Sequence, residues 1–275
     1  MPRILAALAI LVSSTLMMTF NASAQSSRVP STCLAIADNL DQDPQFSITF
    51  ASFKRDASSS LPEVEISFAG HSTYVLKSPA GVLIATDYSG LYGRDESLRV
   101  VTMNHAHTTH YTDFPDPSIE HVLRGWNPDG GPADHHLVVE DVLVRNVTTD
   151  IMNFGFEKDG NSIFIFEVAG LCIGHLGHLH HKLSDAHFGK IGRLDVVMVP
   201  VDGGMTMSHV GIVDILARLR SSVVLPMHVR GFNALPTFLS SLGDGFAIET
   251  RSENKLRLSL KTLPKQPTVI VLPGL

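Results

Sequence analysis

The sequence contains no run rich in lysine and arginine, and its formal net charge is -6 at pH 7. Proteins that bind nucleic acid normally concentrate positive charge on one surface, so this charge balance argues against nucleic acid as a partner. No internal repeat of fixed period is present either. The 275 residues, 44% of them hydrophobic, are enough to bury a sizeable core in one large domain or two small ones.

Cysteine is scarce, with only Cys33 and Cys172 in the chain. The two could form a disulfide in an oxidising compartment, and Cys172, which lies within an apolar run, could equally be a small buried side chain. Both alternatives stay open on the sequence alone.

Long apolar segments are absent after the first 24 residues, so no later segment is long enough to cross a bilayer. The N-terminus itself has the pattern of a secretory signal: Arg3, the mostly apolar stretch 4–20, and Ala22-Ser23-Ala24 as a cleavage site before Gln25. A membrane anchor is the alternative, but polar residues 13–15 interrupt the apolar stretch and no basic flank follows it. We therefore predict cleavage of residues 1–24, a periplasmic or secreted mature protein, and no stable membrane anchor.

Histidines gather where apolar runs end. His105, His107 and His110 follow the apolar run 100–103 with the spacing H-x-H-x-x-H. A second cluster follows the apolar run that begins at Leu171, and it consists of His175, His178, His180 and His181. Neutral imidazole is the commonest metal ligand in proteins, so the pattern predicts a metal site at one edge of a sheet. The alternative is a polar loop that happens to hold histidines.

Strand and helix signals alternate after residue 62. Strands are predicted at 64–68, 73–76, 82–85, 100–103, 137–147, 163–168, 196–201, 223–226, 246–250 and 256–260, and helices at 32–40, 208–219 and 236–242. Residues 158–161 read as a turn, and 114–134 as a loop in which Trp126 could contact a substrate or merely pin the loop. Residues 25–61 are predicted to be an N-terminal extension. This order indicates a layered α/β sandwich.

Several short motifs resemble the metallo-β-lactamase superfamily, in particular its lactonase-like and phospholipase-D-like hydrolases. The resemblance covers roughly residues 62–232 and rests on Ala69-Gly70-His71-Ser72, Ile84-Ala85-Thr86-Asp87, the run His105 to His110, Gly174 to His178, Pro200 to Gly204, and Pro226-Met227-His228. It implies a four-layer αββα sandwich over residues 62–275. It also implies that the histidines hold metal.

Three positions depart from the family's metal-binding pattern. Thr109 stands where the motif has aspartate, His178 stands where an aspartate bridges two metals, and Thr148-Thr149-Asp150 stands where a further histidine is common. Because an imidazole nitrogen binds one metal at a time, one zinc is expected rather than two. The resulting interpretation has His105, His107 and His178 as ligands with water in the fourth position. His110 and His228 would complete a weak second site or contact the substrate, and His71, Asp87 and Asp150 would support the ligands.

Together with the signal-like N-terminus, which predicts secretion, the resemblance implies a hydrolase in which zinc-bound hydroxide attacks an ester, lactone or phosphodiester of small size. The departures at Thr109 and His178 motivate an alternative, a non-catalytic periplasmic protein that binds a metal or another ligand. An open coordination position would favour the enzyme, and a metal saturated by protein ligands would favour the binder. The sequence does not choose a substrate or an oligomeric state.

Overall fold

The computed structural model describes residues 28–34, 61–152 and 155–275. The predicted signal segment 1–24, the helix candidate beyond residue 34 and most of the N-terminal extension therefore lie outside the described residues. Within the described part of the chain, no helix is long and apolar enough to span a membrane.

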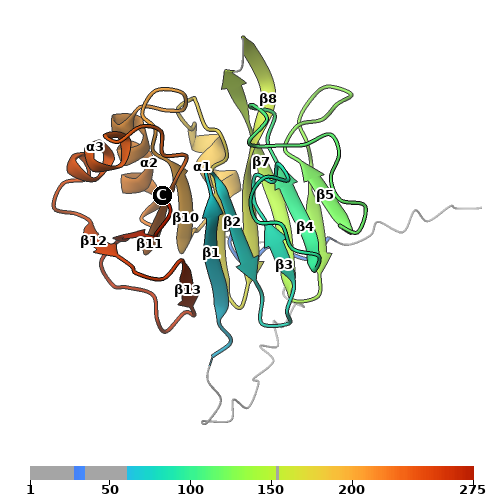
Figure 1. The fold of residues 1–275 in the computed structure, drawn as a ribbon, viewed down its shortest axis with the longest axis horizontal. Helices are drawn as coiled ribbons and strands as arrows, with labels where there is room; N and C mark the ends of the chain where they lie inside the picture. Colours follow the sequence, from blue (N-terminus) through green and yellow to red (C-terminus); the bar gives the residue numbers. More distant parts are fainter. Residues whose placement is uncertain (1–27, 35–60, 153–154) are drawn as a thin grey trace, which may run out of the picture.

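Two β-sheets face each other and form the centre of the protein (Figure 1). The first sheet has six strands, in the order β13 (Lys255–Leu258), β1 (Val64–Gly70), β2 (Thr73–Lys77), β3 (Leu83–Ala85), β4 (Leu98–Met103) and β5 (His121–Arg124). The second has eight strands, in the order β12 (Ala247–Thr250), β14 (Thr268–Val271), β11 (Val223–Met227), β10 (Val196–Pro200), β9 (Leu171–His175), β8 (Phe156–Val168), β7 (Val142–Met152) and β6 (His136–Val139).

Alternating apolar side chains join the two sheets into one core. Ile66, Tyr74 and Ile84 of the first sheet and Phe164 and Met198 of the second belong to one buried cluster, and each is at most 1% exposed. Full burial of such side chains contributes about 1.5–3 kcal/mol each relative to exposure. The Tyr74 hydroxyl also donates a hydrogen bond of 2.7 Å to the Pro226 carbonyl of the second sheet. Both apolar contacts and a hydrogen bond thus hold the two sheets against each other.

Three helices cover the outer face of the second sheet: α1 (Asp185–Ile191), α2 (His209–Leu219) and α3 (Ala234–Ser241). The α2 helix begins after Ser208, whose hydroxyl accepts the Gly211 N–H, and it buries Ile212 and Leu216 against the sheet. On the outer face of the first sheet the described residues form loops that pack on a smaller cluster around Tyr88 and Met103. The predicted α/β fold with two sandwiched sheets is confirmed.

Two local predictions are wrong and three elements were not predicted. The expected strand 137–147 is a hairpin of β6 and β7 that turns at Glu140, which has a φ of 51°. The expected turn at 158–161 is part of β8, which pairs with β7 along most of its length. The short strand β5 lies inside the expected loop 114–134, and α1 and β14 had no recognised signal.

The parallel strands end at one edge of the molecule. In the second sheet β9, β10, β11 and β14 are parallel, and in the first sheet β3, β4 and β5 are parallel. Parallel neighbours finish side by side, and ligands of open α/β sheets bind beyond these carboxyl ends. The histidine-rich segments after β4, β9 and β11 are therefore brought together by topology.

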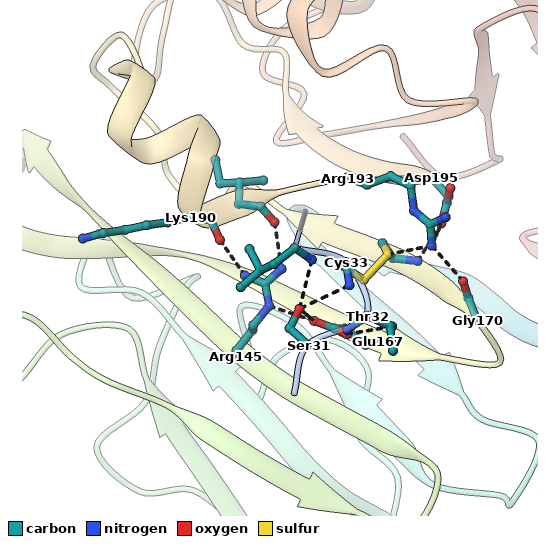
Figure 2. The surroundings of a disulfide bond; sticks show 12 residues. Ser31, Thr32, Cys33, Arg145, Glu167, Gly170, Lys190, Arg193 and Asp195 are labelled. Atoms are coloured by element: carbon teal, nitrogen blue, oxygen red, sulfur yellow. Dashed lines mark hydrogen bonds and ion pairs between the residues drawn. A yellow bond between two sulfur atoms is a disulfide. The ribbon is translucent and has the colours of Figure 1, made fainter. Parts of the chain in front are cut away.

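A short N-terminal segment is fastened to the second sheet by a disulfide between Cys33 and Cys172 (Figure 2). Beside it, Ser31 and Thr32 donate hydrogen bonds to the carboxylate of Glu167, which is also paired with Arg145 at 2.8 Å. The structure thus favours pairing of the two cysteines over a free buried thiol. A disulfide that joins residues 139 positions apart typically stabilises a domain by about 2–5 kcal/mol.

The Arg145 guanidinium links this segment to α1. It donates hydrogen bonds of 2.8 and 2.7 Å to the carbonyl oxygens of Lys190 and Ile191, at the end of that helix (Figure 2). Helix ends leave carbonyl groups without intrahelical partners, so Arg145 satisfies both the helix end and Glu167.

Candidate metal centre

Four histidines converge where the two sheets end. His71, His107, His110 and His228 each offer a ring nitrogen, and these atoms all lie within 4.8 Å of one another. His110 and His228 are buried and the other two are half-buried. We refer to these four residues as the histidine cluster. They come from three separate places in the chain: the turn between β1 and β2, the loop after β4, and the residue that follows β11.

Backbone geometry holds three residues of this region in the left-handed conformation. His71, Asp87 and His228 have φ values of 53°, 43° and 54°. Such values are uncommon for residues other than glycine and cost of order 1–3 kcal/mol each, and they concentrate at functional sites. The His228 N–H donates a 2.7 Å hydrogen bond to the His71 carbonyl, so the two turns fix each other.

The outer nitrogen of three of these rings lies beside a polar side chain, through a hydrogen bond for His107 and His110 and at ion-pair distance for His228. Nδ1 of His110 lies 2.7 Å from Asp87, Nδ1 of His107 lies 2.8 Å from the Thr109 hydroxyl, and Nδ1 of His228 lies 3.0 Å from a carboxylate oxygen of Asp202. The Nε2 atoms are left to face the cluster, and those of His107 and His228 are 3.5 Å apart. Histidines that bind metal normally have their other nitrogen engaged in this way.

Each supporting carboxylate has its own fixed partners. Asp87 accepts a 2.8 Å hydrogen bond from the Asn104 amide, whose oxygen accepts the Ser162 N–H at 2.6 Å. Asp202 accepts the backbone N–H groups of residues 204–206 and the hydroxyl of Thr206. These contacts within the chain set the direction of both carboxylates.

Burial keeps two of the cluster rings, those of His71 and His107, neutral. Burial is the main cause that lowers the pKa of His71 to about 3 and that of His107 to about 4, and the charges that neighbouring histidines would carry add to it. A neutral ring has the free electron pair that a metal ligand needs. Neutral pH therefore favours the ligand form of these rings.

The two carboxylates are ionised by contrast. Burial alone would raise the pKa of Asp87, but His110, His175 and the hydrogen bond from Asn104 outweigh it, so this pKa lies below its ordinary value. The pKa of Asp202 is lowered for the same kind of reason, because contacts with His228 and Thr206 outweigh the effect of burial. The site thus holds two ionised carboxylates, one beside His110 and one beside His228.

The cluster fits a metal ion on two observations. Nε2 of His71 and Nε2 of His110 are buried and have no hydrogen-bond partner among the described residues, a situation that costs about 1–3 kcal/mol per atom unless a ligand satisfies it. The 3.5 Å between Nε2 of His107 and Nε2 of His228 is close to the roughly 3.3 Å that separates two ligands of a tetrahedral zinc with bonds of about 2.0–2.1 Å.

His178, expected from the sequence as a ligand, lies beside the cluster but is not one of its four members. Its ring centre is 5.1 Å from that of His107, 4.7 Å from that of His110 and 4.8 Å from that of His228. Both of its ring nitrogens are buried without a hydrogen-bond partner in the described part of the chain. Burial is the largest cause that lowers its pKa to about 2, so the ring is neutral and polar in a tight space.

His105, the other expected ligand, faces away from the cluster. Its Nδ1 lies 2.7 Å from Glu157, and its ring stacks on Trp126 with ring centres 4.9 Å apart. The His105 N–H donates to the Gly160 carbonyl, which ties this part of the loop to β8 and directs the ring toward that strand. The expected trio of His105, His107 and His178 is therefore not brought together around one point, and the ligand set stays a proposal.

Of the three residues that the sequence predicted to support the ligands, one holds a cluster ring and two have other places. Asp87 does hold His110, whereas Asp150 accepts the Asp159 N–H across the β7–β8 pair. His71 belongs to the cluster itself rather than to its surroundings. Sequence reasoning missed Asp202, although an aspartate directly after a buried parallel strand was a usable signal.

Comparison with known proteins agrees with this geometry. Residues 65–228 match the family model described as the β-lactamase superfamily domain. The chain belongs to this family. The match covers more than half of the 275 residues and includes every member of the histidine cluster.

Solved structures of the same fold are similar over most of their length. One is a protein from Thermotoga maritima, provisionally assigned as a zinc-dependent hydrolase of the metallo-β-lactamase superfamily; it is 26% identical with a TM-score of 0.54, and the match covers 76% of this chain and 98% of that one. A Parabacteroides distasonis protein, provisionally assigned as a metal-dependent hydrolase, is 14% identical with a TM-score of 0.53 over 66% of this chain and 90% of its own. The latter likeness concerns the fold alone. Comparison with curated protein sequences gave no match.

Proposed function

We propose that this protein is a metal-dependent hydrolase whose histidine cluster holds a divalent ion, with zinc as the first candidate. One observation carries the proposal: ring nitrogens of four histidines converge, and the outer nitrogens of three lie beside Asp87, Asp202 and Thr109. All-imidazole sites suit zinc among the abundant divalent metals, although copper, iron and nickel also accept such ligands. Family membership and the zinc-dependent assignment of the Thermotoga relative support the choice.

The chemistry that a bound divalent ion supplies is polarisation of a carbonyl or phosphoryl group and activation of water at neutral pH. The chain's own residues prepare the site for it. Asp87 and Asp202 fix the orientation of His110 and His228 and keep Nε2 of each ring available. His178 is neutral, and its unpartnered ring can exchange a hydrogen bond with a substrate oxygen beside the cluster.

A non-catalytic metal-binding protein is the second candidate, because four imidazoles are enough to saturate one zinc. The relatives argue for the enzyme, because the Thermotoga protein, which is 26% identical, is provisionally assigned as a zinc-dependent hydrolase.

The proposed substrates are small esters, lactones or phosphodiesters. A metal removal experiment tests the proposal. The protein is purified without added metal, its metal is measured, and hydrolysis of one substrate of each kind is followed before chelation, after chelation and after return of zinc. We expect activity to disappear with the metal and to return with it, because the neutral rings release and rebind a divalent ion reversibly.

Two results of that experiment would contradict hydrolysis by this site. Hydrolysis that persists after complete metal removal would mean that another part of the chain performs it. Tight metal binding without turnover of any of the three substrate kinds would favour the non-catalytic protein.

We also propose that the mature protein is secreted or periplasmic. The signal-like pattern at residues 1–24 and the Cys33–Cys172 disulfide support this, because disulfides persist mainly in oxidising compartments. Intact mass measured on protein from a secreting host is expected to correspond to a chain that starts at Gln25 and contains one disulfide. A mass that includes residues 1–24, or one that shows two free thiols, would contradict it.

A further inference from the structure

We propose that Arg230 forms an anion-binding subsite at the edge of the histidine cluster and that the natural substrate carries a negative charge next to the bond that is cleaved. The inference rests on the proposed hydrolase function and narrows its substrate class. The group recognised is a carboxylate or a phosphate oxygen.

Arg230 lies close to the histidine cluster. Arg230 follows His228 by two residues, beyond the end of β11, and is exposed. Its guanidinium lies 2.5 Å from the Met205 sulfur, and the Met205 N–H donates to Asp202, the carboxylate beside His228. A chain of direct contacts thus leads from Arg230 back to the cluster.

Other arginines of this protein are neutralised by a carboxylate, but Arg230 has no such partner in the described part of the chain. Arg99, Arg145 and Arg218 each pair with a carboxylate at 2.5–2.8 Å. Within the part of the chain that the structure describes, Arg230 forms no ion pair, and its one hydrogen-bond contact is with a thioether, a weak acceptor. A guanidinium held in place without an anion is prepared to bind one.

A cavity that begins next to Asp87 is a poorer place for an anion. It begins at Tyr88, directly after Asp87, and has a volume of about 430 Å³. One arginine, Arg94, lines it together with the carboxylates of Asp95, Glu96 and Asp116. Repulsion from three carboxylates disfavours a negative group there, so the Arg230 side of the cluster is the better anion subsite.

Arg230→Gln and Arg230→Lys test the proposal, with Arg220→Gln as the matched control. Arg220 is exposed at the end of α2, before β11 begins, so the control removes the same charge at the far end of that strand. The first measurement is the affinity of zinc-loaded protein for inorganic phosphate. We expect Arg230→Gln to weaken it about 10- to 100-fold at unchanged metal content, since charge-assisted contacts are lost. Arg230→Lys should weaken it less, because a lysine keeps the charge but not the fork geometry.

The second measurement compares two esters that differ only in a carboxylate or an uncharged amide near the scissile bond. Arg230→Gln should lower kcat/KM for the charged ester about 10- to 100-fold, mainly through KM, and leave the uncharged ester within about twofold. Unchanged phosphate affinity in Arg230→Gln, or an equal loss in Arg220→Gln, would overturn the subsite. A wild-type protein that binds phosphate through Arg230 but hydrolyses no ester, lactone or phosphodiester would leave the subsite standing and reject the hydrolase.

Discussion

Replacement of His228 by alanine is expected to abolish stoichiometric metal binding and hydrolysis, while replacement of His105 leaves the metal content unchanged. His228 is buried in the cluster, with one ring nitrogen beside Asp202 and the other facing His107. Loss of a ligand should weaken metal binding by more than the 10- to 100-fold that loss of a supporting group causes. His105 is the matched control, because it has the same chemistry two residues from His107 yet pairs with Glu157.

Metal content of the two variants, measured after dialysis against the same buffer, checks this prediction. The sequence motif alone predicts the opposite behaviour for His105, since it occupies the first position of the H-x-H-x-x-H pattern. Loss of metal from His105→Ala would show that its ring turns toward the ion when metal binds. Retention of metal by His228→Ala would remove that residue from the ligand set.

Asp87→Asn is expected to lower metal affinity about 10- to 100-fold and to destabilise the fold by about 1–3 kcal/mol. Both oxygens of Asp87 accept hydrogen bonds, one from Asn104 and one from Nδ1 of His110. An asparagine has one oxygen and one amide group, so a donor must face either Asn104 or His110. If it faces His110, the proton of that ring moves to Nε2, and the ring no longer has a free electron pair toward the cluster.

The control for Asp87 is Asp134→Asn, which makes the same chemical change in an ion pair with Arg28 at the surface. Exposed pairs contribute about 0–1 kcal/mol, so this variant should keep the wild-type metal affinity and nearly the wild-type stability. Zinc affinity by competition with a chelating dye and unfolding by urea give the two quantities. A wild-type zinc affinity in Asp87→Asn would contradict the assignment of Asp87 as the group that orients His110.

The sequence predicted the edge of the molecule at which the site forms, because this depends on strand ends. Buried apolar runs before His105, His175 and His228 are strands in the structure. Parallel pairing brings the ends of β9 and β11 together on either side of β10, and β4 reaches them from the facing sheet. Ring direction could not be predicted in this way. His105 and His107 lie two residues apart in a bent loop, and only the contact between His105 and β8 decides that the two rings point to different places.

Site residues that stand alone in the sequence were also hard to predict. His71 gave no spacing signal, and its place in the cluster depends on the long-range hydrogen bond from His228 to its carbonyl. Strand boundaries were hard to predict where the chain turns at a residue other than glycine. The β6–β7 turn places Glu140 at positive φ, where glycine or asparagine is usual, so an apolar run on both sides of it looked like one strand.

X-ray absorption spectroscopy of the zinc-loaded protein, combined with metal content per chain, tests the central claim most directly. The account predicts a single ion whose first shell contains imidazole nitrogens at about 2.0–2.1 Å, with no second metal nearby. A metal–metal distance of about 3.5–4 Å, as in two-metal hydrolases, or a protein that binds no zinc with its four histidines intact, would contradict it.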